Sequence, residues 1–320
     1  MHVCLADQIK DVSASAEDFR PLTRDEMATH LLQQTGGGFA IQQTEHFVIC
    51  SNASELYTDY CGRLLEKVAR EYVELMTRLK IQLQPLPKQL PVIIFRRSEE
   101  LQQHASRQHP NVSFADVPGY YSMTFNQMLV AGLSGDHTFT SRGDVVRELK
   151  TNLRQVETIV HEAVHQLAFN SGLQVRMADN PMWFSEGLAV YFEHANGSGN
   201  ASWSGPGGVN RIHHPGFVRA AINEECVIPL ERLVTSDAVF QSEDPTIIAA
   251  AYAESWALVY YLIRRKPDSF SQLATTIQHR LPLVPVSAQQ RLQAFKDALS
   301  GPLPELQRDL IRSIRRLKVR

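Results

Sequence analysis

In the first 132 residues, segments with apolar residues at helical spacing alternate with short segments that have the composition of strands. Between 53 and 80 apolar residues recur every three or four positions, which predicts a long amphipathic helix lying on a sheet. Residues 39–50 and 90–95 have the composition of strands, the second because it is a short β-branched run. A polar helix is expected over 98–108, and two strands joined by a tight turn over 119–132. This half therefore predicts alternating strands and helices.

Beyond Asp144 the pattern predicts helices alone. The expected helices span 145–170, 181–195, 216–224, 246–265, 268–279, 287–299 and 304–317. Glycine and serine residues between 196 and 208 mark the one conspicuous loop. Because strands and helices are segregated along the chain, we expect an α+β fold in which a C-terminal helical lobe packs beside a mixed sheet.

Composition and charge narrow the classes of function. The 320 residues are 43% hydrophobic, which allows a sizeable core. With 32 basic and 34 acidic side chains the formal net charge is −2, so no global field favours nucleic acid and no nucleic-acid partner is expected. The four scattered cysteines are expected as buried thiols, with a Cys50–Cys61 bridge as the alternative in an exported protein. Function should therefore be sought in a local site.

The sequence predicts neither a membrane span nor a secretory signal. The nearest candidate for a span, residues 249–263, is interrupted by Glu254. The first ten residues include Asp7 and lack both a basic flank and an apolar run. These patterns leave the localisation open: the protein is exported if a signal lies upstream of this sequence, and otherwise cytoplasmic. The pattern indicates no particular oligomeric state.

The segment 158–167 contains an HExxH motif within a helical pattern. His161 and His165 are one helical turn apart, so their imidazoles project from one face and can bind a single metal ion. Glu162 is adjacent, within reach of a metal-bound water. The opposite face of the helix is apolar and can anchor it in the core. A catalytic zinc, however, needs a third protein ligand from elsewhere in the chain.

Glu186 is the candidate for that third ligand. It follows His165 by 21 residues, which is enough for the first helix to end, a loop to turn back and a second helix to run alongside. Asn180 is expected as the N-cap of the second helix and Pro181 as its first residue. A carboxylate in a mostly apolar helix needs a partner, and zinc supplies one.

The segments HEAVHQLAFN and NPMWFSEGLAVYFE resemble the gluzincin metallopeptidases, which include the M1-type aminopeptidases and uncharacterised bacterial peptidase-MA-like domains. The resemblance covers residues 158–193. It implies a zincin-like fold, one zinc ion held by His161, His165 and Glu186, and Glu162 as the general base.

Two further positions follow from the resemblance. Tyr252 comes 66 residues after Glu186, where the family places a tyrosine that points into the cleft, and it is expected to hydrogen-bond the oxyanion. The alternative is a core tyrosine on an apolar helix. Aminopeptidases of this group carry a glutamate in a strand before the zinc helix, but residues 119–126 contain no acid. The chain is therefore not expected to be an aminopeptidase, although this strand could pair with an extended peptide.

These inferences divide the chain into three regions. Residues 1–38 form an N-terminal arm, 39–195 a zincin-like catalytic region with the sheet and the zinc-binding helices, and 196–320 a helical lobe that completes the cleft. We expect a zinc-dependent peptidase that hydrolyses a peptide or protein substrate. The alternatives are a catalytically inactive zinc-containing domain that binds a peptide or protein, and a metal-free helical protein in which the motif is accidental.

Overall fold

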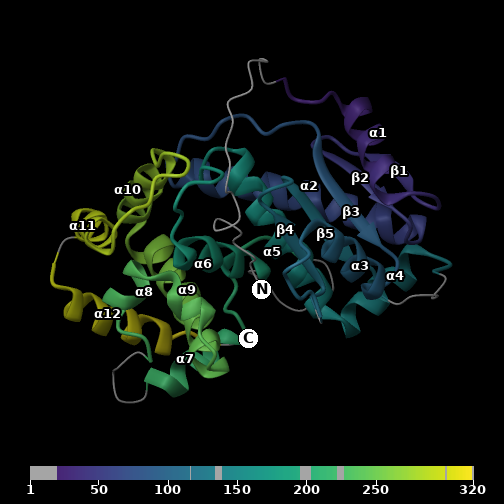
Figure 1. The fold of residues 1–320 in the computed structure, drawn as a ribbon. Helices are drawn as coiled ribbons and strands as arrows, with labels where there is room; N and C mark the ends of the chain where they lie inside the picture. The colour runs from purple at the N-terminus through teal and green to yellow at the C-terminus, as the bar shows by residue number, and fades with distance from the viewer. Residues whose placement is uncertain are drawn as a thin grey trace. The chain divides into compact units, whose positions relative to one another are not determined.

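The computed structural model describes residues 20–115, 117–133, 139–194, 203–221, 227–299 and 301–318. The chain forms two compact units (Figure 1). The first contains the described residues up to 70 and those from 85 to 167, and the second contains 71–84 and the described residues from 168 onward. Cys4, Cys226 and most of the predicted loop over 196–208 lie outside the described residues.

The first unit is built on a five-stranded mixed sheet with the strand order β1-β2-β3-β5-β4. The strands are β1 (Ala40–Gln43), β2 (Phe47–Ser51), β3 (Leu90–Phe95), β4 (Gly119–Ser122) and β5 (Gln127–Ala131). The three central strands are parallel to one another, and β1 and β4 are antiparallel edge strands. Together with the helices this sheet confirms the α+β expectation.

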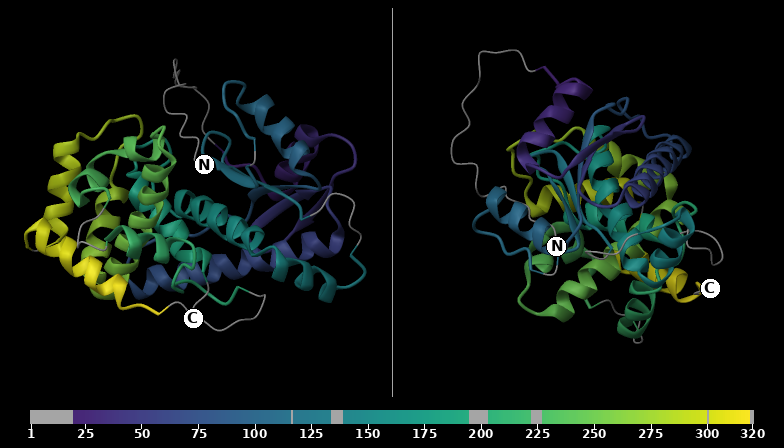
Figure 2. Two further views of the ribbon diagram at one scale, coloured as in Figure 1. Left: turned by 90° about the horizontal axis from the view of Figure 1, so that it is seen from below. Right: turned by 90° about the vertical axis from the view of Figure 1, so that its right-hand side faces the viewer.

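Helices cover both faces of this sheet (Figure 2). On one face lie α1 (Arg24–Thr35) and α3 (Ser98–Gln108). They share a buried cluster with the strands, which includes Leu31, Leu101, Val48, Ile93 and Leu129. On the other face lie α2 (Glu55–Arg78) and α5 (Leu153–Asn170), while α4 (Arg142–Thr151) precedes α5. The Gln166 side chain of α5 donates a hydrogen bond of 2.9 Å to the carbonyl of Pro91 in β3. The helix that carries the HExxH motif is thus tied directly to the sheet.

Helix α1 lies within residues 1–38, the segment that the sequence predicts as an N-terminal arm. Its apolar pattern is weak, and Leu31 is its only fully buried residue. Its start is nevertheless encoded in a capping box, in which the Thr23 hydroxyl accepts from the Glu26 N–H and the Glu26 carboxylate accepts from the Thr23 N–H at 2.8 Å. The motif Thr23-x-x-Glu26 would have predicted this helix where hydrophobic spacing did not.

The described part of the second unit is helical apart from one isolated β-bridge. Its helices are α6 (Met182–Glu193), α7 (His213–Ala220), α8 (Leu230–Thr235), the 3-10 helix η3 (Asp237–Gln241), α9 (Pro245–Arg265), α10 (Pro267–Gln278), α11 (Ala288–Ala298) and α12 (Leu303–Arg315). Six of the seven predicted helices correspond to one helix each, and the predicted helix over 145–170 is divided into α4 and α5 at Asn152. Short α8 and η3 were not predicted, because six and five residues are too few to establish a period.

Helix α9 is the central helix of the second unit. Among the described helices it alone has the length and hydropathy to cross a membrane, but 67% of its apolar window is buried within the protein. It packs against α6, α7, α10 and α12. The apolar character of α9 is therefore accounted for by helix packing, and it provides no clear membrane span.

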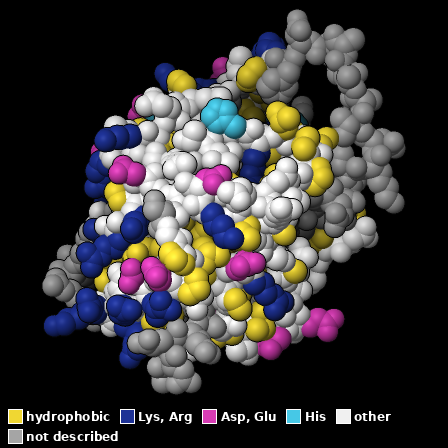
Figure 3. All heavy atoms as spheres, turned by 90° about the vertical axis from the view of Figure 1, so that its left-hand side faces the viewer, with side chains coloured by type: hydrophobic (Ala, Val, Ile, Leu, Met, Phe, Trp, Pro, Cys, Tyr) yellow, Lys and Arg dark blue, Asp and Glu magenta, His cyan; other side chains and the backbone are white. Residues whose placement is uncertain are grey.

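Helix α12 is amphipathic. It buries Leu310, Ile311 and Ile314 and exposes arginines at 308, 312, 315 and 316. Figure 3 shows one face of the protein, on which basic and acidic side chains are interspersed and the basic ones are more frequent toward the lower left. Cations near a helix C-terminus interact favourably with the helix dipole, so Arg312, Arg315 and Arg316 suit the end of α12.

Glu254 is a buried carboxyl group in the middle of α9. Only 3% of the residue is exposed. It accepts hydrogen bonds from the N–H groups of Val227 at 2.8 Å and Ile228 at 3.3 Å, which joins α9 to the segment before α8. Burial raises the pKa of Glu254 to about 8, although both hydrogen bonds act in the opposite direction.

We expect the free energy of unfolding of wild type to fall, relative to that of the Glu254→Gln variant, as the pH rises from 5 to 8. The unfolded chain loses the Glu254 proton near pH 4.5, whereas the folded protein keeps it until about pH 8. The free energy of unfolding of wild type therefore falls across this window, by an amount on the order of 3 kcal/mol. Glutamine has no such proton. Urea unfolding at pH 5, 6.5 and 8 measures the difference, with the exposed Glu243→Gln as the control. A difference that does not change with pH would show that burial does not raise this pKa.

Candidate metal centre

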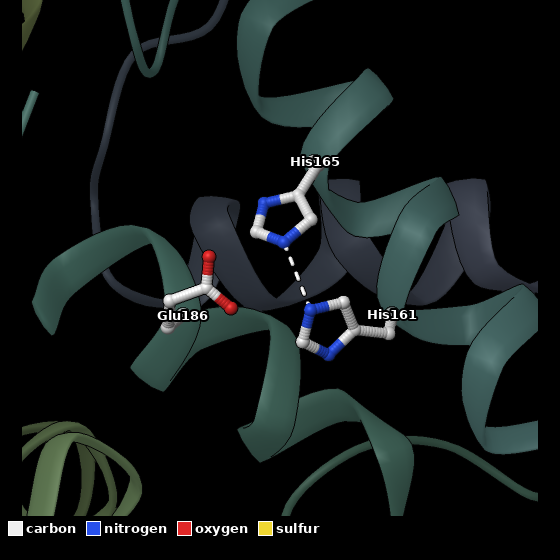
Figure 4. Close-up of side chains that lie close together, drawn as sticks. All are labelled: His161, His165 and Glu186. Carbon is white, nitrogen blue, oxygen red and sulfur yellow. Dashed lines mark hydrogen bonds between the residues drawn. The ribbon is translucent and has the colours of Figure 1, made fainter. Parts of the chain in front are cut away.

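Helix α5 holds the HExxH motif. His165 is fully buried and His161 is partly exposed. Their Nε2 atoms lie 3.0 Å apart, and their ring centroids lie 4.7 Å apart. Figure 4 marks the contact between the two rings with a dashed line. Two zinc–nitrogen bonds of about 2.05 Å at a tetrahedral angle would place the two nitrogens roughly 3.3 Å apart. The imidazole pair therefore has close to the spacing that a shared zinc ion requires.

Glu162 is held by the edge strand of the same unit. Its side chain is 5% exposed, and its Oε2 accepts a hydrogen bond of 2.8 Å from the backbone N–H of Tyr121 in β4. The carbonyl of Pro118 accepts a hydrogen bond from the Ala131 N–H of β5. In an antiparallel pair the main-chain groups of successive residues point alternately toward the partner strand and away from it, so those of Tyr121, three residues later, point away from β5. This outward N–H fixes one carboxylate oxygen of Glu162.

Gly119 allows α5 to lie directly beside β4. A Cβ atom at Gly119 would be 3.0 Å from Cγ2 of Thr158 in α5 and 2.9 Å from the carbonyl oxygen of Leu129. Gly119 lies next to Thr158, and Tyr121 bonds to Glu162. From the first contact to the second the chain advances two residues along β4 and four residues, about one turn, along α5. Helix and edge strand thus run side by side, which accounts for the position of Glu162.

Helix α6 carries Glu186. Ten of its residues in succession, Trp183 to Phe192, are buried, and Glu186 itself is 1% exposed. The expected N-cap is wrong, because the Asn180 side chain donates to the carbonyls of Val175 and Ala178 instead of capping the helix. The N–H of Met182, the first residue of α6, donates to Oδ1 of Asp237 at 2.8 Å. The helix start is therefore fixed by a side chain distant in sequence.

Gly187 lets α6 approach α9 at the residue next to Glu186. A Cβ atom there would lie 2.5 Å from the carbonyl oxygen of Ser255 and 2.7 Å from Cγ2 of Val259. Contacts this short with backbone require the helices to move apart. Glycine is thus needed at this position for packing, although it weakens a helix interior.

We expect Gly187→Ala to lower the free energy of unfolding by about 1–3 kcal/mol, the usual cost of overpacking. Alanine favours the helix by about 1 kcal/mol, and this gain does not offset the clash. The matched control is Gly216→Ala in α7, where an added Cβ meets nothing within 4 Å and stability should be unchanged or higher. Urea unfolding of both variants measures the effect. Equal stability of the two would contradict close packing at Gly187.

One donor atom from each of His161, His165 and Glu186 lies within 4.8 Å of the other two. Figure 4 shows the Glu186 carboxylate turned toward the two imidazoles. Two imidazoles and one carboxylate are the ligand set of several catalytic zinc sites, in which the fourth position is taken by water or substrate. The three predicted ligands are therefore of the right type and close enough to hold one zinc ion.

A second group of possible ligands, Glu45, His46 and Glu66, has another explanation. Oε1 of Glu66 accepts from the hydroxyl of Thr44 at 2.5 Å and from the N–H of His46 at 2.7 Å. Its Oε2 pairs with Nδ1 of His46 at 2.8 Å. These bonds brace the turn between β1 and β2, so both oxygens of Glu66 already serve the fold.

Tyr252 lies in α9 and is partly exposed. Its ring stacks on that of His213 at 6.4 Å and meets Phe240 edge-on at 5.5 Å. These contacts neither place its hydroxyl at an oxyanion nor make it a fully buried core residue. Its role in the site stays a prediction.

Glu193 follows Glu186 by two turns of α6. Its Oε2 accepts from the side chain of Asn210 at 3.1 Å, and Oδ1 of the same asparagine accepts from the N–H of His213 at the start of α7. Glu193 therefore helps to hold α7 on α6.

Comparison with known proteins gives one family match. Residues 155–284 match the family described as a protein of unknown function, DUF1570. That stretch includes all five predicted site residues, namely His161, Glu162, His165, Glu186 and Tyr252. The description gives the family no activity. No curated protein matches the chain.

Proposed function

We propose that this protein is a zinc-dependent peptidase of the gluzincin type. The observation that carries the proposal is the position of Glu162, a buried acid beside the paired imidazoles of α5 with one oxygen fixed by the Tyr121 N–H at 2.8 Å. A purely structural zinc site is closed by four protein ligands and has no use for such an acid. An acid held next to the ligands is what metal-assisted hydrolysis requires.

His161, His165 and Glu186 are the residues that would hold the ion. When bound, zinc supplies a water of lowered pKa and polarises the carbonyl of the scissile bond. All other groups that the reaction needs come from the chain itself.

Glu162 is the proposed general base. Its carboxylate takes a proton from the attacking water and afterwards delivers it to the leaving nitrogen. The Tyr121 N–H fixes Oε2, so the carboxylate keeps one orientation during both transfers. Among the described residues no group donates a hydrogen bond to Oε1 of Glu162. We therefore assign to Oε1 the role of accepting the proton from the water. Tyr252 is the proposed hydrogen-bond donor to the oxyanion, on the basis of the family resemblance.

Strand β4 is the proposed docking edge for an extended substrate. It is an edge strand, and Gly119 and Tyr121 direct their main-chain groups away from β5. The outward N–H of Tyr121 is already bonded to Glu162, so main-chain pairing with a substrate would use the outward N–H and C=O of Gly119. The strand carries no acidic side chain to bind a free amino terminus, which favours cleavage of internal bonds over aminopeptidase activity.

Digestion of a peptide library tests the proposal. The zinc-loaded full chain should produce new cleavage products, detected by mass spectrometry, that disappear with a chelator and return when zinc is restored. A protein that binds one zinc ion and cleaves nothing in a broad library would instead be the inactive zinc-containing binding domain. A protein that takes up no zinc would overturn the metal centre itself.

A further inference from the structure

The first turn of α6 is fixed by a partly buried ionic cluster formed by Asp179, Asp237, Arg280 and Arg291, here called the Arg291 cluster. Asp237 accepts from the Met182 N–H with Oδ1 and from the Arg291 guanidinium with Oδ2, each at 2.8 Å. A helix leaves its first N–H groups without intrahelical acceptors, so a carboxylate at this position stabilises the helix start. Arg291 in turn fixes the carboxylate that provides the cap.

Asp179 ties the residues before α6 into the same cluster. Its Oδ1 accepts from the Arg291 guanidinium, and its Oδ2 accepts from the Val286 N–H at 2.7 Å. Its main-chain carbonyl accepts from the guanidinium of Arg280. Arg291 thus connects the carboxylate of Asp179 with that of Asp237, which caps Met182, and holds both against α11.

Arg291 is only 8% exposed. Burial alone would lower the pKa of Arg291, but the hydrogen bonds and charges of Asp237 and Asp179 raise it above its usual value. Loss of the Arg291 charge would leave the Asp179 and Asp237 carboxylates, each about a quarter exposed, close together without a shared cation. The two carboxylates therefore depend on Arg291 to keep their positions.

Met182 and Glu186 are one helical turn apart, so in the α-helical pattern the Glu186 N–H donates to the carbonyl of Met182. A shift in the first turn of α6 is therefore passed directly to Glu186. Gly187 constrains the next residue through its contact with Ser255 of α9. The position of the Glu186 carboxylate is thus set from both sides, by the Arg291 cluster at the helix start and by close packing beyond it.

We infer that Arg291 is a positioning residue for the proposed metal ligand Glu186, acting through Asp237 and Asp179 on the first turn of α6. This inference rests on the proposed function, because it takes Glu186 to be a ligand. Arg291 lies 105 residues from Glu186 in the sequence and is not a proposed ligand. Its substitution should nevertheless lower the metal affinity.

The test compares metal affinity in wild type, Arg291→Met, Asp237→Ala and Asp237→Asn. Loss of outer supporting groups commonly weakens metal binding about 10- to 100-fold, and we expect about tenfold or more for Arg291→Met. Asp237→Ala should behave similarly. Asp237→Asn keeps an oxygen that can cap Met182 but turns an NH2 donor toward the Arg291 guanidinium, so its affinity should fall between those of Asp237→Ala and wild type. Dissociation constants are obtained by competition with a chromophoric chelator. The cobalt-substituted proteins provide an absorption spectrum that reports the geometry at the metal.

The control is Arg312→Met, which removes an exposed arginine of the same unit that lies 4.0 Å from Asp309. Urea unfolding is measured in parallel, since a general structural role would lower stability without changing the cobalt spectrum of the folded protein. If Arg291→Met does not fold, the pair of Asp237 variants decides the question. Equal cobalt spectra and zinc affinities in wild type and in the folded variants would overturn the inference and leave the metal centre intact. Failure of wild type to bind zinc would instead overturn the proposed function.

Discussion

Glu162→Gln should lower kcat/KM for peptide hydrolysis by roughly 10²- to 10⁴-fold, the usual contribution of a general base, while the protein still binds one zinc ion. The glutamine side-chain oxygen can still accept the hydrogen bond from the Tyr121 N–H, so the geometry at this position is kept. Only the capacity to take a proton is lost. Steady-state kinetics on a peptide identified from the library, together with metal analysis, measures both quantities.

The control for this substitution is Glu99→Gln, which changes an exposed glutamate in α3 of the same unit. Its kinetics should match those of wild type. Hydrolysis by zinc-loaded Glu162→Gln at the wild-type rate would remove Glu162 from the mechanism, and a mechanism without this base would need a different proton acceptor.

Glu186→Gln should weaken zinc binding by more than the approximately 100-fold that loss of an outer supporting group can cause. Glutamine preserves the shape of a side chain that is 1% exposed, so the packing of α6 is retained. It removes the negative charge, however, and neutral amides are poorer zinc ligands than carboxylates. Equilibrium dialysis followed by metal analysis measures the dissociation constant.

The matched control is Glu193→Gln, seven residues further along the same face of α6, where the carboxylate is bonded to Asn210. This variant should keep one zinc ion with nearly unchanged affinity. If the two variants bind zinc equally well, Glu186 does not coordinate the ion, and a different third ligand must be sought.

Local patterns predicted those features that depend on residues close in sequence. The β-branched run at 90–95 gave β3, and the spacing of four residues in HExxH placed His161 and His165 on one helical face, as observed. The break at Asn152 was missed because the apolar spacing continues across it, with Val145, Leu149 and Val156 all buried. Hydrophobic periodicity alone does not reveal a helix end.

Features that join distant segments could not be predicted from the sequence. The hydrogen bond to Glu162 comes from a main-chain N–H of β4, and only its place at the sheet edge leaves that group available. Asp237 lies 55 residues from the Met182 N–H that it caps, and Arg291 lies 112 residues from Asp179. Side chains with no local pattern carry these contacts, so they become apparent only when the helices of the second unit are assembled.

The most direct test of the metal centre is a crystal structure of the zinc-loaded protein with anomalous scattering measured at the zinc edge. The proposal predicts one anomalous peak, about 2.0–2.2 Å from nitrogens of His161 and His165 and from an oxygen of Glu186, with Glu162 beside it but outside its ligand shell. A zinc ion bound elsewhere, or a Glu186 carboxylate that lies away from the occupied imidazole pair, would contradict it.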